Sequence, residues 1–112
     1  MSDNMVEWNY KQDYVQEAAH LTFSTALCLL KDGKRLSRSG WNGSGMFTVY
    51  QPGYPNGISI NENTQKALNM PAGTIVKFRP YLLLKTVDGS CVPWVPSISD
   101  ILAEDWFVME NN

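Results

Sequence analysis

The segment from residue 74 to residue 95 constrains the fold more than any other part of the chain. Residues 74–87 and 91–95 are rich in side chains that favour β-strands, and Asp88-Gly89 separates them. Such a pair between two β-prone runs is the strongest short-range signal for a hairpin, and a type I′ turn fits it. Pro80 interrupts the longer run, which predicts a sheet edge or a β-bulge there. The segment therefore predicts an antiparallel sheet.

The clearest helix is predicted over residues 22–32, with Thr22 as its N-cap. An apolar stripe follows the i, i+3, i+4, i+7 spacing of one helix face and consists of Phe23, Ala26, Leu27 and Leu30. Gly33 is the expected left-handed residue after the last turn. The apolar face of this helix is expected to pack on a sheet formed by the rest of the chain.

Shorter elements fill the rest of the chain. Residues 34–38, 46–51 and 106–109 are β-prone, residues 39–45 form a turn, and residues 52–57 have the proline and glycine content of a loop. Asn61 is the predicted cap of a helix that ends at Met70, and Ser97-x-x-Asp100 resembles a capping box for a helix over residues 98–104. We therefore predict a single α+β domain over residues 21–112, with the N-terminal helix packed on a small antiparallel β-sheet. Residues 1–20 are predicted to be an N-terminal extension.

The inventory of reactive side chains excludes several kinds of site. Cys28 and Cys91 stand far apart in the sequence, so the local cysteine pairs of a zinc site are missing. We expect them to be buried free thiols of a reducing cytosol, with one disulfide as the alternative. His20 is the single histidine and is predicted to be an exposed residue beside the helix. No metal, cofactor, signal peptide or membrane span is predicted.

Charge is unevenly distributed along the chain, although the net charge is only -2. Residues 31–85 carry an excess of six positive charges, and both flanking segments are acidic. This basic centre has two interpretations, and the sequence leaves both open. It attracts a phosphate-bearing ligand, or the acidic ends of the chain fold back on it and neutralise its charge. Long nucleic acid is disfavoured because the chain as a whole is not basic.

The chain is rich in aromatic residues and poor in charged residues. The chain has 4 Trp, 5 Tyr and 4 Phe, whereas charged residues make up only 18%. A short chain of this kind places some rings on its surface, which favours ligand stacking or self-association. Trp41 lies in the turn Gly40-Trp41-Asn42-Gly43, where glycines allow a ligand to approach the backbone and Asn42 can hydrogen-bond a base edge. The alternative is a tight turn with a core tryptophan.

The segment Val92-Pro93-Trp94-Val95-Pro96 holds the second candidate ring. A tryptophan between two prolines loses little entropy on binding, as a stacking platform requires. The alternative is an edge strand whose tryptophan covers the core. Ser97 and Asp100 are candidates for hydrogen bonds to a sugar, although helix capping by Ser97 and a solvated acidic turn explain them better.

A row of basic residues is predicted on the long strand. Lys77, Arg79 and Lys85 are separated by even numbers of residues, which places their side chains on one face of the strand. That face binds phosphates, or it is simply a solvent-exposed face. Thr86 falls on the opposite face. Taken from the residues alone, the chain is a binding domain without catalytic equipment.

Four motifs in this order resemble the Thoeris anti-defence protein 2 family of phages and prophages. They are Leu21-Thr22-Phe23-x2-Ala26-Leu27, then Gly33-Lys34-x3-Arg38-x-Gly40-Trp41-Asn42-Gly43, then Lys85-Thr86-x-Asp88-Gly89, and then Val92-Pro93-Trp94-x2-Ser97-x2-Asp100-x-Leu102-Ala103-Glu104-Asp105-Trp106. The resemblance covers residues 21–109.

The resemblance implies a homotetrameric sponge in the cytoplasm of the infected bacterium. Members bind the cyclic ADP-ribose signal of bacterial TIR-domain proteins without cleaving it, and some also take cyclic dinucleotides at a separate site. The family's tryptophans match Trp41 and Trp94. The expected ligand-binding set, for glycocyclic ADP-ribose above all, is Trp41, Asn42, Gly43, Phe47, Arg79, Lys85, Thr86, Trp94, Ser97 and Asp100. The alternatives are a phosphodiesterase acting on a cyclic nucleotide, or a module that binds single-stranded RNA or a protein.

Overall fold

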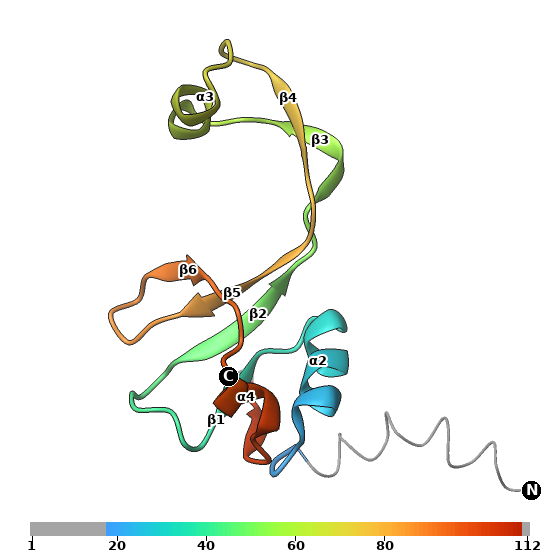
Figure 1. Cartoon of the computed structure of the whole chain (residues 1–112), viewed down its shortest axis with the longest axis vertical. Coiled ribbons are helices and arrows are strands. Elements are labelled where there is room, and N and C mark those ends of the chain that lie inside the picture. Colours follow the sequence, from blue (N-terminus) through green and yellow to red (C-terminus); the bar gives the residue numbers. More distant parts are fainter. Residues whose placement is uncertain (1–17, 111–112) are drawn as a thin grey trace, which may run out of the picture. The chain divides into compact units, whose positions relative to one another are not determined.

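The computed structural model describes residues 18–110, and the predictions made for residues 1–17 lie outside this range. The predicted α+β class with an antiparallel sheet is confirmed (Figure 1). The chain divides into two compact units. The core unit holds the described residues up to Tyr50 and from Leu82 onward, and the inserted unit is Gln51–Tyr81.

Helix α2 (Phe23–Lys31) begins and ends as the sequence predicts. The Thr22 side chain accepts a hydrogen bond from the backbone N–H of Thr25, and Gly33 follows the helix with a φ of 95°. The left-handed conformation at this position costs glycine little, because it has no Cβ. The helix buries Ala26, Leu29 and Leu30.

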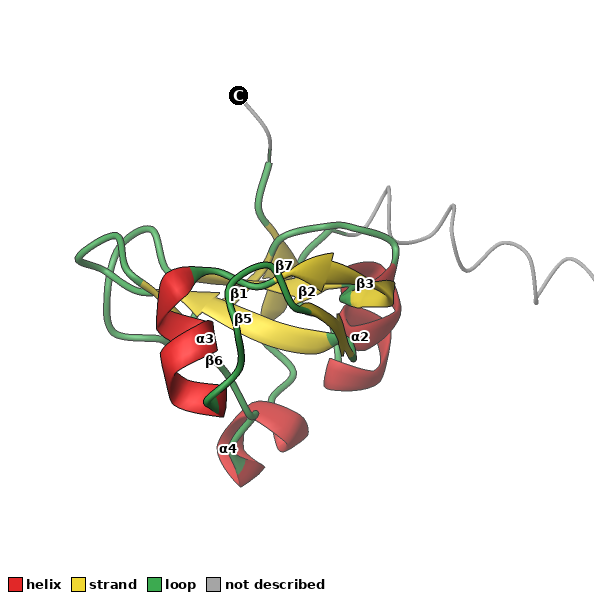
Figure 2. Ribbon diagram, turned by 90° about the horizontal axis from the view of Figure 1, so that it is seen from above, coloured by secondary structure: helices red, strands yellow, loops and turns green. Residues whose placement is uncertain are grey.

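A five-stranded sheet forms the body of the core unit. Its strands are β1 (Leu36–Arg38), β2 (Phe47–Gln51), β5 (Tyr81–Lys85), β6 (Cys91–Pro93) and β7 (Trp106–Val108), in the order β6-β5-β2-β1-β7. The pairs β1–β2, β1–β7 and β5–β6 are antiparallel. Helix α2 and helix α4 (Ile98–Leu102) lie on the same side of this sheet (Figure 2).

The hydrophobic core lies between helix α2 and the sheet. Its fully buried members include Leu29, Leu30, Leu36 and Trp106, and the backbone of Leu21 pairs with that of Trp106. The hydroxyl of Thr48 is also buried and donates to the carbonyl of Leu83 at 2.8 Å, which satisfies a polar group that would otherwise destabilise the core. The predicted packing of helix on sheet is thus confirmed.

The predicted hairpin is present, but its turn type is not type I′. That turn requires a positive φ at both central residues. Asp88 does not have one, because His20 and Asn69 are the only non-glycine residues with positive φ in the described range. Instead, Gly89 donates its N–H to the carbonyl of Thr86 at 3.0 Å and itself has a φ of 90°, which makes a three-residue loop with a glycine bulge.

The inserted unit corrects the prediction of a loop over residues 52–57. Strand β3 (Tyr54–Ser59) runs through Pro55 and Gly57 and pairs with β4 (Ile75–Phe78) in a two-stranded antiparallel sheet. The register shifts between Tyr54 and Ile58. A proline and a glycine are tolerated here because the strand has a partner on one side only and is irregular in the middle. Between the strands, Asn61 caps helix α3 (Glu62–Leu68), as predicted.

The long run over residues 74–87 is not one strand. It forms β4 and β5, which belong to different sheets, and Pro80 lies between them. Proline cannot donate to a strand ladder, so the run breaks at that position. The prediction that Lys77, Arg79 and Lys85 share one face of one strand is therefore wrong.

Both cysteines are exposed and free, which corrects the prediction that they are buried. Cys28 lies on the outer side of helix α2, and Cys91 begins the edge strand β6. His20 is exposed, as predicted. Within residues 18–110, no helix is long and apolar enough to span a bilayer, and no three metal-binding side chains converge.

Candidate functional site

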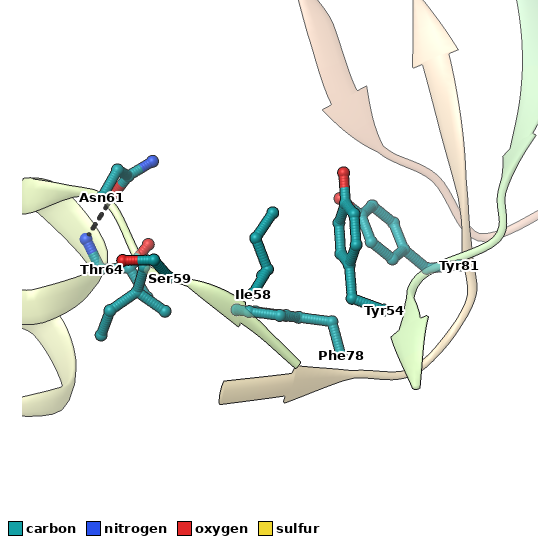
Figure 3. Close-up of a pocket in the computed structure, with 8 residues that line it drawn as sticks. Tyr54, Ile58, Ser59, Asn61, Thr64, Phe78 and Tyr81 are labelled. Carbon is teal, nitrogen blue, oxygen red and sulfur yellow. Dashed lines mark hydrogen bonds between the residues drawn. The ribbon is translucent and has the colours of Figure 1, made fainter. Parts of the chain in front are cut away.

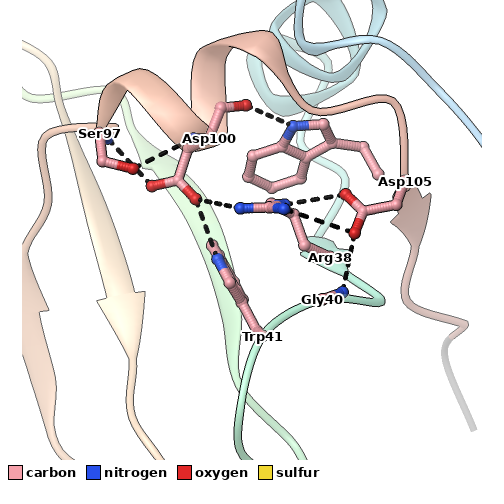
Figure 4. Close-up of polar contacts among 7 residues, drawn as sticks. Arg38, Gly40, Trp41, Ser97, Asp100 and Asp105 are labelled. Atoms are coloured by element: carbon pink, nitrogen blue, oxygen red, sulfur yellow. Dashed lines mark hydrogen bonds and ion pairs between the residues drawn. The ribbon is translucent and has the colours of Figure 1, made fainter.

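Arg38 is the centre of a polar network at one edge of the core unit (Figure 4). Its Nη1 atom donates to Oδ1 of Asp100 at 2.9 Å, and its Nε atom donates to Oδ1 of Asp105 at 2.8 Å. The second oxygen of Asp105 accepts the backbone N–H of Gly40 at 2.8 Å. One arginine at the end of β1 thus connects α4, the segment before β7 and the turn after β1.

Asp100 has a second set of partners from its own helix and from Trp41. Its Oδ2 atom accepts the backbone N–H of Ser97, and the Ser97 hydroxyl accepts the backbone N–H of Asp100, so the predicted capping box is confirmed. The indole N–H of Trp41 donates to Oδ1 at 3.0 Å, and that of Trp106 donates to the Asp100 carbonyl at 2.9 Å. Asp100 is only 7% exposed, so these contacts orient two indole rings from within the protein.

The network shifts the pKa of each of its ionisable groups. Burial raises the pKa of Asp100, but hydrogen bonds from Ser97, Trp41 and Arg38 outweigh it and hold the pKa below its ordinary value. The hydrogen bond from Arg38 lowers the pKa of Asp105. The same bond raises the pKa of Arg38. All three groups are therefore charged at neutral pH, as structural ion pairs are.

Three tryptophans that are distant in sequence meet beside this network. Trp41 and Trp94 have ring centroids 6.0 Å apart at 80°, and both rings contact the buried Trp106 edge to face, at 5.3 and 6.1 Å. Phe23 of α2 packs against Trp106 at 5.6 Å. We call Trp41, Trp94 and Trp106 the tryptophan cluster. Trp41 and Trp94 pack on the core but remain partly exposed, so each indole is held rigidly with part of its surface open to solvent.

The turn beside Trp41 holds Asn42 and Gly43, both exposed. Gly43 has a φ of 136°, and a Cβ built there would lie 2.3 Å from Cγ2 of Val87. The glycine is therefore required by close packing against the hairpin. Whether Asn42 and Gly43 contact a ligand stays a prediction.

Phe47 and Lys85 also come together, on the strands β2 and β5. The Lys85 Nζ atom lies 5.4 Å from the Phe47 ring centroid, and the guanidinium carbon of Arg35 lies 5.1 Å from it. Two cationic side chains thus contact one aromatic ring, and Arg35 also donates to the backbone carbonyl of Glu110 at 2.7 Å. Arg35 was missed by the sequence reasoning, because its place beside Phe47 depends on strand pairing.

The remaining predicted residues have other surroundings. Thr86 donates its hydroxyl to Asp88 at 2.5 Å within the hairpin turn, and this bond holds the pKa of Asp88 at about 2. Arg79 is exposed and belongs to the inserted unit, directly after β4. Their roles toward a ligand stay predictions, as do those of Ser97 and Asp100.

The inserted unit has a pocket that the sequence reasoning missed (Figure 3). Its volume is about 380 Å³, and its lining includes Tyr54, Ile58, Phe78 and Tyr81. The clue in the sequence was one aromatic residue within the predicted loop, Tyr54, and two in the β-prone run over residues 74–87, Phe78 and Tyr81. Only the pairing of β3 with β4 brings these aromatic residues together.

Comparison with known proteins is consistent with the sequence motifs. Residues 21–109 match the family described as the Thoeris anti-defense 2-like domain. The protein named Thoeris anti-defense 2 from Bacillus phage SP01 is 34% identical over 89 residues, which cover 80% of this chain and 94% of that protein. The match spans every described helix and strand of both units.

Proposed function

The chain belongs to the Thoeris anti-defense 2-like family, and from this premise we propose that it counters Thoeris immunity during phage infection. We further propose that it does so by binding glycocyclic ADP-ribose and withholding it from the defence effector, without cleaving it. The observation that supports this mechanism most is the tryptophan cluster, where two partly exposed indoles are fixed at 80° to each other.

Rigid rings suit a protein that acts by sequestration. A sponge neutralises its ligand one for one, so its affinity must exceed the working concentration of the signal. Affinity rises when the binding groups lose little freedom on binding. The indole of Trp41 is already held by Asp100, and that of Trp94 is held against Trp106, so the adenine ring meets surfaces that do not have to reorganise.

Lys85 beside Phe47 supplies the complementary chemistry for a pyrophosphate. Its Nζ atom lies 5.4 Å from the Phe47 ring centroid, on the strand β5 of the core unit. Attraction of phosphate oxygens to this cation adds to stacking on the tryptophans, and neither requires a nucleophile or a metal.

A release experiment tests the mechanism. The protein is mixed with glycocyclic ADP-ribose and filtered, and the filtrate should no longer activate the effector. Heating the retained complex should return the intact nucleotide, and recovery of a cleaved product would overturn sequestration in favour of a phosphodiesterase. Trp94→Ala should abolish depletion, because the ring is lost from the cluster. Val92→Ala is the matched control, since Val92 lies two residues before Trp94, is 40% exposed and belongs to neither the tryptophan cluster nor the apolar surface beside α4.

We also propose that the chain assembles as a homotetramer and that cyclic dinucleotides are further ligands. An apolar surface on and beside α4 supports assembly: Val95, Ile98 and Leu102 are 86%, 72% and 73% exposed. Apolar surface of this kind is typical of interfaces. Native mass spectrometry with each nucleotide would give the number of chains and the number of bound ligands in one measurement.

A further inference from the structure

The pocket of the inserted unit offers chemistry that the proposed function does not use. We propose that it binds a flat, uncharged heteroaromatic ring, such as the base of a purine nucleoside. The pocket lies wholly within residues 54–81, and its volume of about 380 Å³ is in the range of small-molecule sites. This inference does not rest on the sequestration of glycocyclic ADP-ribose.

The strand register builds the aromatic wall of the pocket. Tyr54 of β3 is paired with Phe78 of β4, and Ile58 is paired with Val76. Paired residues of neighbouring strands point to the same face, so Tyr54, Phe78 and Ile58 project together (Figure 3). The register of the two strands shifts between Tyr54 and Ile58.

A close crossing of the chain fixes the position of that wall. Gly53 has a φ of 82°, and a Cβ built on it would lie 2.6 Å from the carbonyl oxygen of Phe78. The backbone before Tyr54 therefore touches the backbone after Phe78, and no other residue type fits. Tyr81 follows three residues later and lies beside Tyr54 in Figure 3.

The rings are exposed in a way that a core would not allow. Tyr54 and Tyr81 are both 43% exposed and Ile58 is 36% exposed, whereas Ile60 at 6% is the buried hydrophobic residue of this unit. Leaving two large rings in water sacrifices their burial energy, and ring faces held in a concave site are suited to stacking.

Polar groups at the other end of the pocket favour a heteroaromatic ring over a hydrocarbon. Asn61 accepts the backbone N–H of Thr64 with its Oδ1 atom at 2.9 Å, and within the described residues its amide nitrogen has no acceptor. Ser59 also lines the pocket and adds a hydroxyl-bearing side chain. No charged side chain lines the pocket, so a phosphate finds no partner there.

Nuclear magnetic resonance or calorimetric titration with adenosine and guanosine tests the proposal on the full chain. At least one nucleoside should bind, and Tyr54→Ala or Tyr81→Ala should weaken its affinity at least tenfold. Tyr54→Phe and Tyr81→Phe keep the rings and should bind nearly normally. Lys77→Ala is the matched control, because Lys77 is exposed on β4 next to Phe78 but does not line the pocket. Ribose 5-phosphate, which lacks the ring, should not bind.

Two results would overturn the proposal. One is that neither nucleoside binds, and the other is that binding persists in the tyrosine-to-alanine variants but disappears in Trp94→Ala. The circular dichroism spectrum of each variant reports whether it is folded. If an alanine variant unfolds, Tyr54→Leu removes the ring but keeps apolar bulk, and it should weaken binding where Tyr54→Phe does not. Depletion of glycocyclic ADP-ribose is measured separately, so a failure here leaves that proposal standing, and the reverse also holds.

Discussion

The core unit and the inserted unit use aromatic residues in opposite ways. In the core unit, Trp106 is fully buried, and its contacts with Trp41 and Trp94 form a cluster supported by Arg38 and Asp100. In the inserted unit, Tyr54 and Tyr81 remain 43% exposed around a pocket. The core unit therefore anchors its partly exposed rings on one fully buried ring, whereas the inserted unit leaves its two tyrosines around a pocket.

Replacing one aromatic ring in each unit should give the largest difference in the free energy of unfolding between the two units. We expect Trp106→Ala to lower the free energy of unfolding by about 4 kcal/mol, because it removes a fully buried ring and leaves a cavity. Tyr54→Ala should lower it by less than about 1.5 kcal/mol, since much of that ring is already in water. Urea denaturation followed by circular dichroism measures both. Equal losses would contradict the division of roles.

Removal of a cation should give the next largest contrast. Arg38→Met leaves the buried Asp100 without its ion pair, and we expect a loss of about 3 kcal/mol in the free energy of unfolding. Lys66→Met is the control in the inserted unit. Lys66 pairs with Glu62 at 3.0 Å, but both side chains are more than three-quarters exposed, so the loss should stay below about 0.5 kcal/mol.

A third contrast uses two glycines with positive φ. Gly43→Ala adds both backbone strain and a clash with Val87, so we expect a loss of about 2–3 kcal/mol in the free energy of unfolding. Gly73→Ala, in the inserted unit, meets open space and adds only the strain of its φ of 82°, or about 1 kcal/mol. The double variant Gly43→Ala with Val87→Ala should recover part of the loss. No recovery would show that the clash is unimportant.

Lowering the pH should produce the smallest change in stability, and this change should arise from the core unit. The pKa values of Asp100 and Asp105 are lower in the folded protein than their ordinary value of 3.8. Their contribution to stability is therefore complete above about pH 5 and is lost as the pH falls through the folded values. Thermal unfolding between pH 7 and pH 2.5 measures this loss. Asp105→Asn should flatten the decline, and an unchanged pH profile would remove Asp105 from the explanation.

Local signals in the sequence were sufficient for elements that depend on a few neighbouring residues. Thr22 and Gly33 set the ends of α2, and Ser97 with Asp100 forms the capping box of α4, because caps are hydrogen bonds within one turn. The α+β class also followed from the sequence, since the helical stripe and the β-prone runs are long enough to read separately. These features need no contact between distant segments.

Other features were decided by contacts that the sequence does not display. Pro55 and Gly57 look like loop residues, yet pairing with β4 makes them part of a strand. The basic residues Lys77 and Lys85 looked like members of one strand. In the structure they lie on β4 and β5, which belong to different sheets and are separated at Pro80. A local pattern cannot reveal which strand supplies the missing hydrogen-bond partners.

The sequence by itself determined that this chain is a small α+β domain rich in aromatic residues and poor in catalytic groups, with Trp41 and Trp94 as candidate platforms. Only the tertiary structure decided that these two rings meet at Trp106 and that Asp100 and Arg38 hold Trp41 from within. It alone placed Tyr54 opposite Phe78 and so formed the pocket of the inserted unit. The physical reason is that these ring contacts and ion pairs join residues as far apart in sequence as Phe23 and Trp106 or Arg38 and Asp105, and chain folding sets those distances.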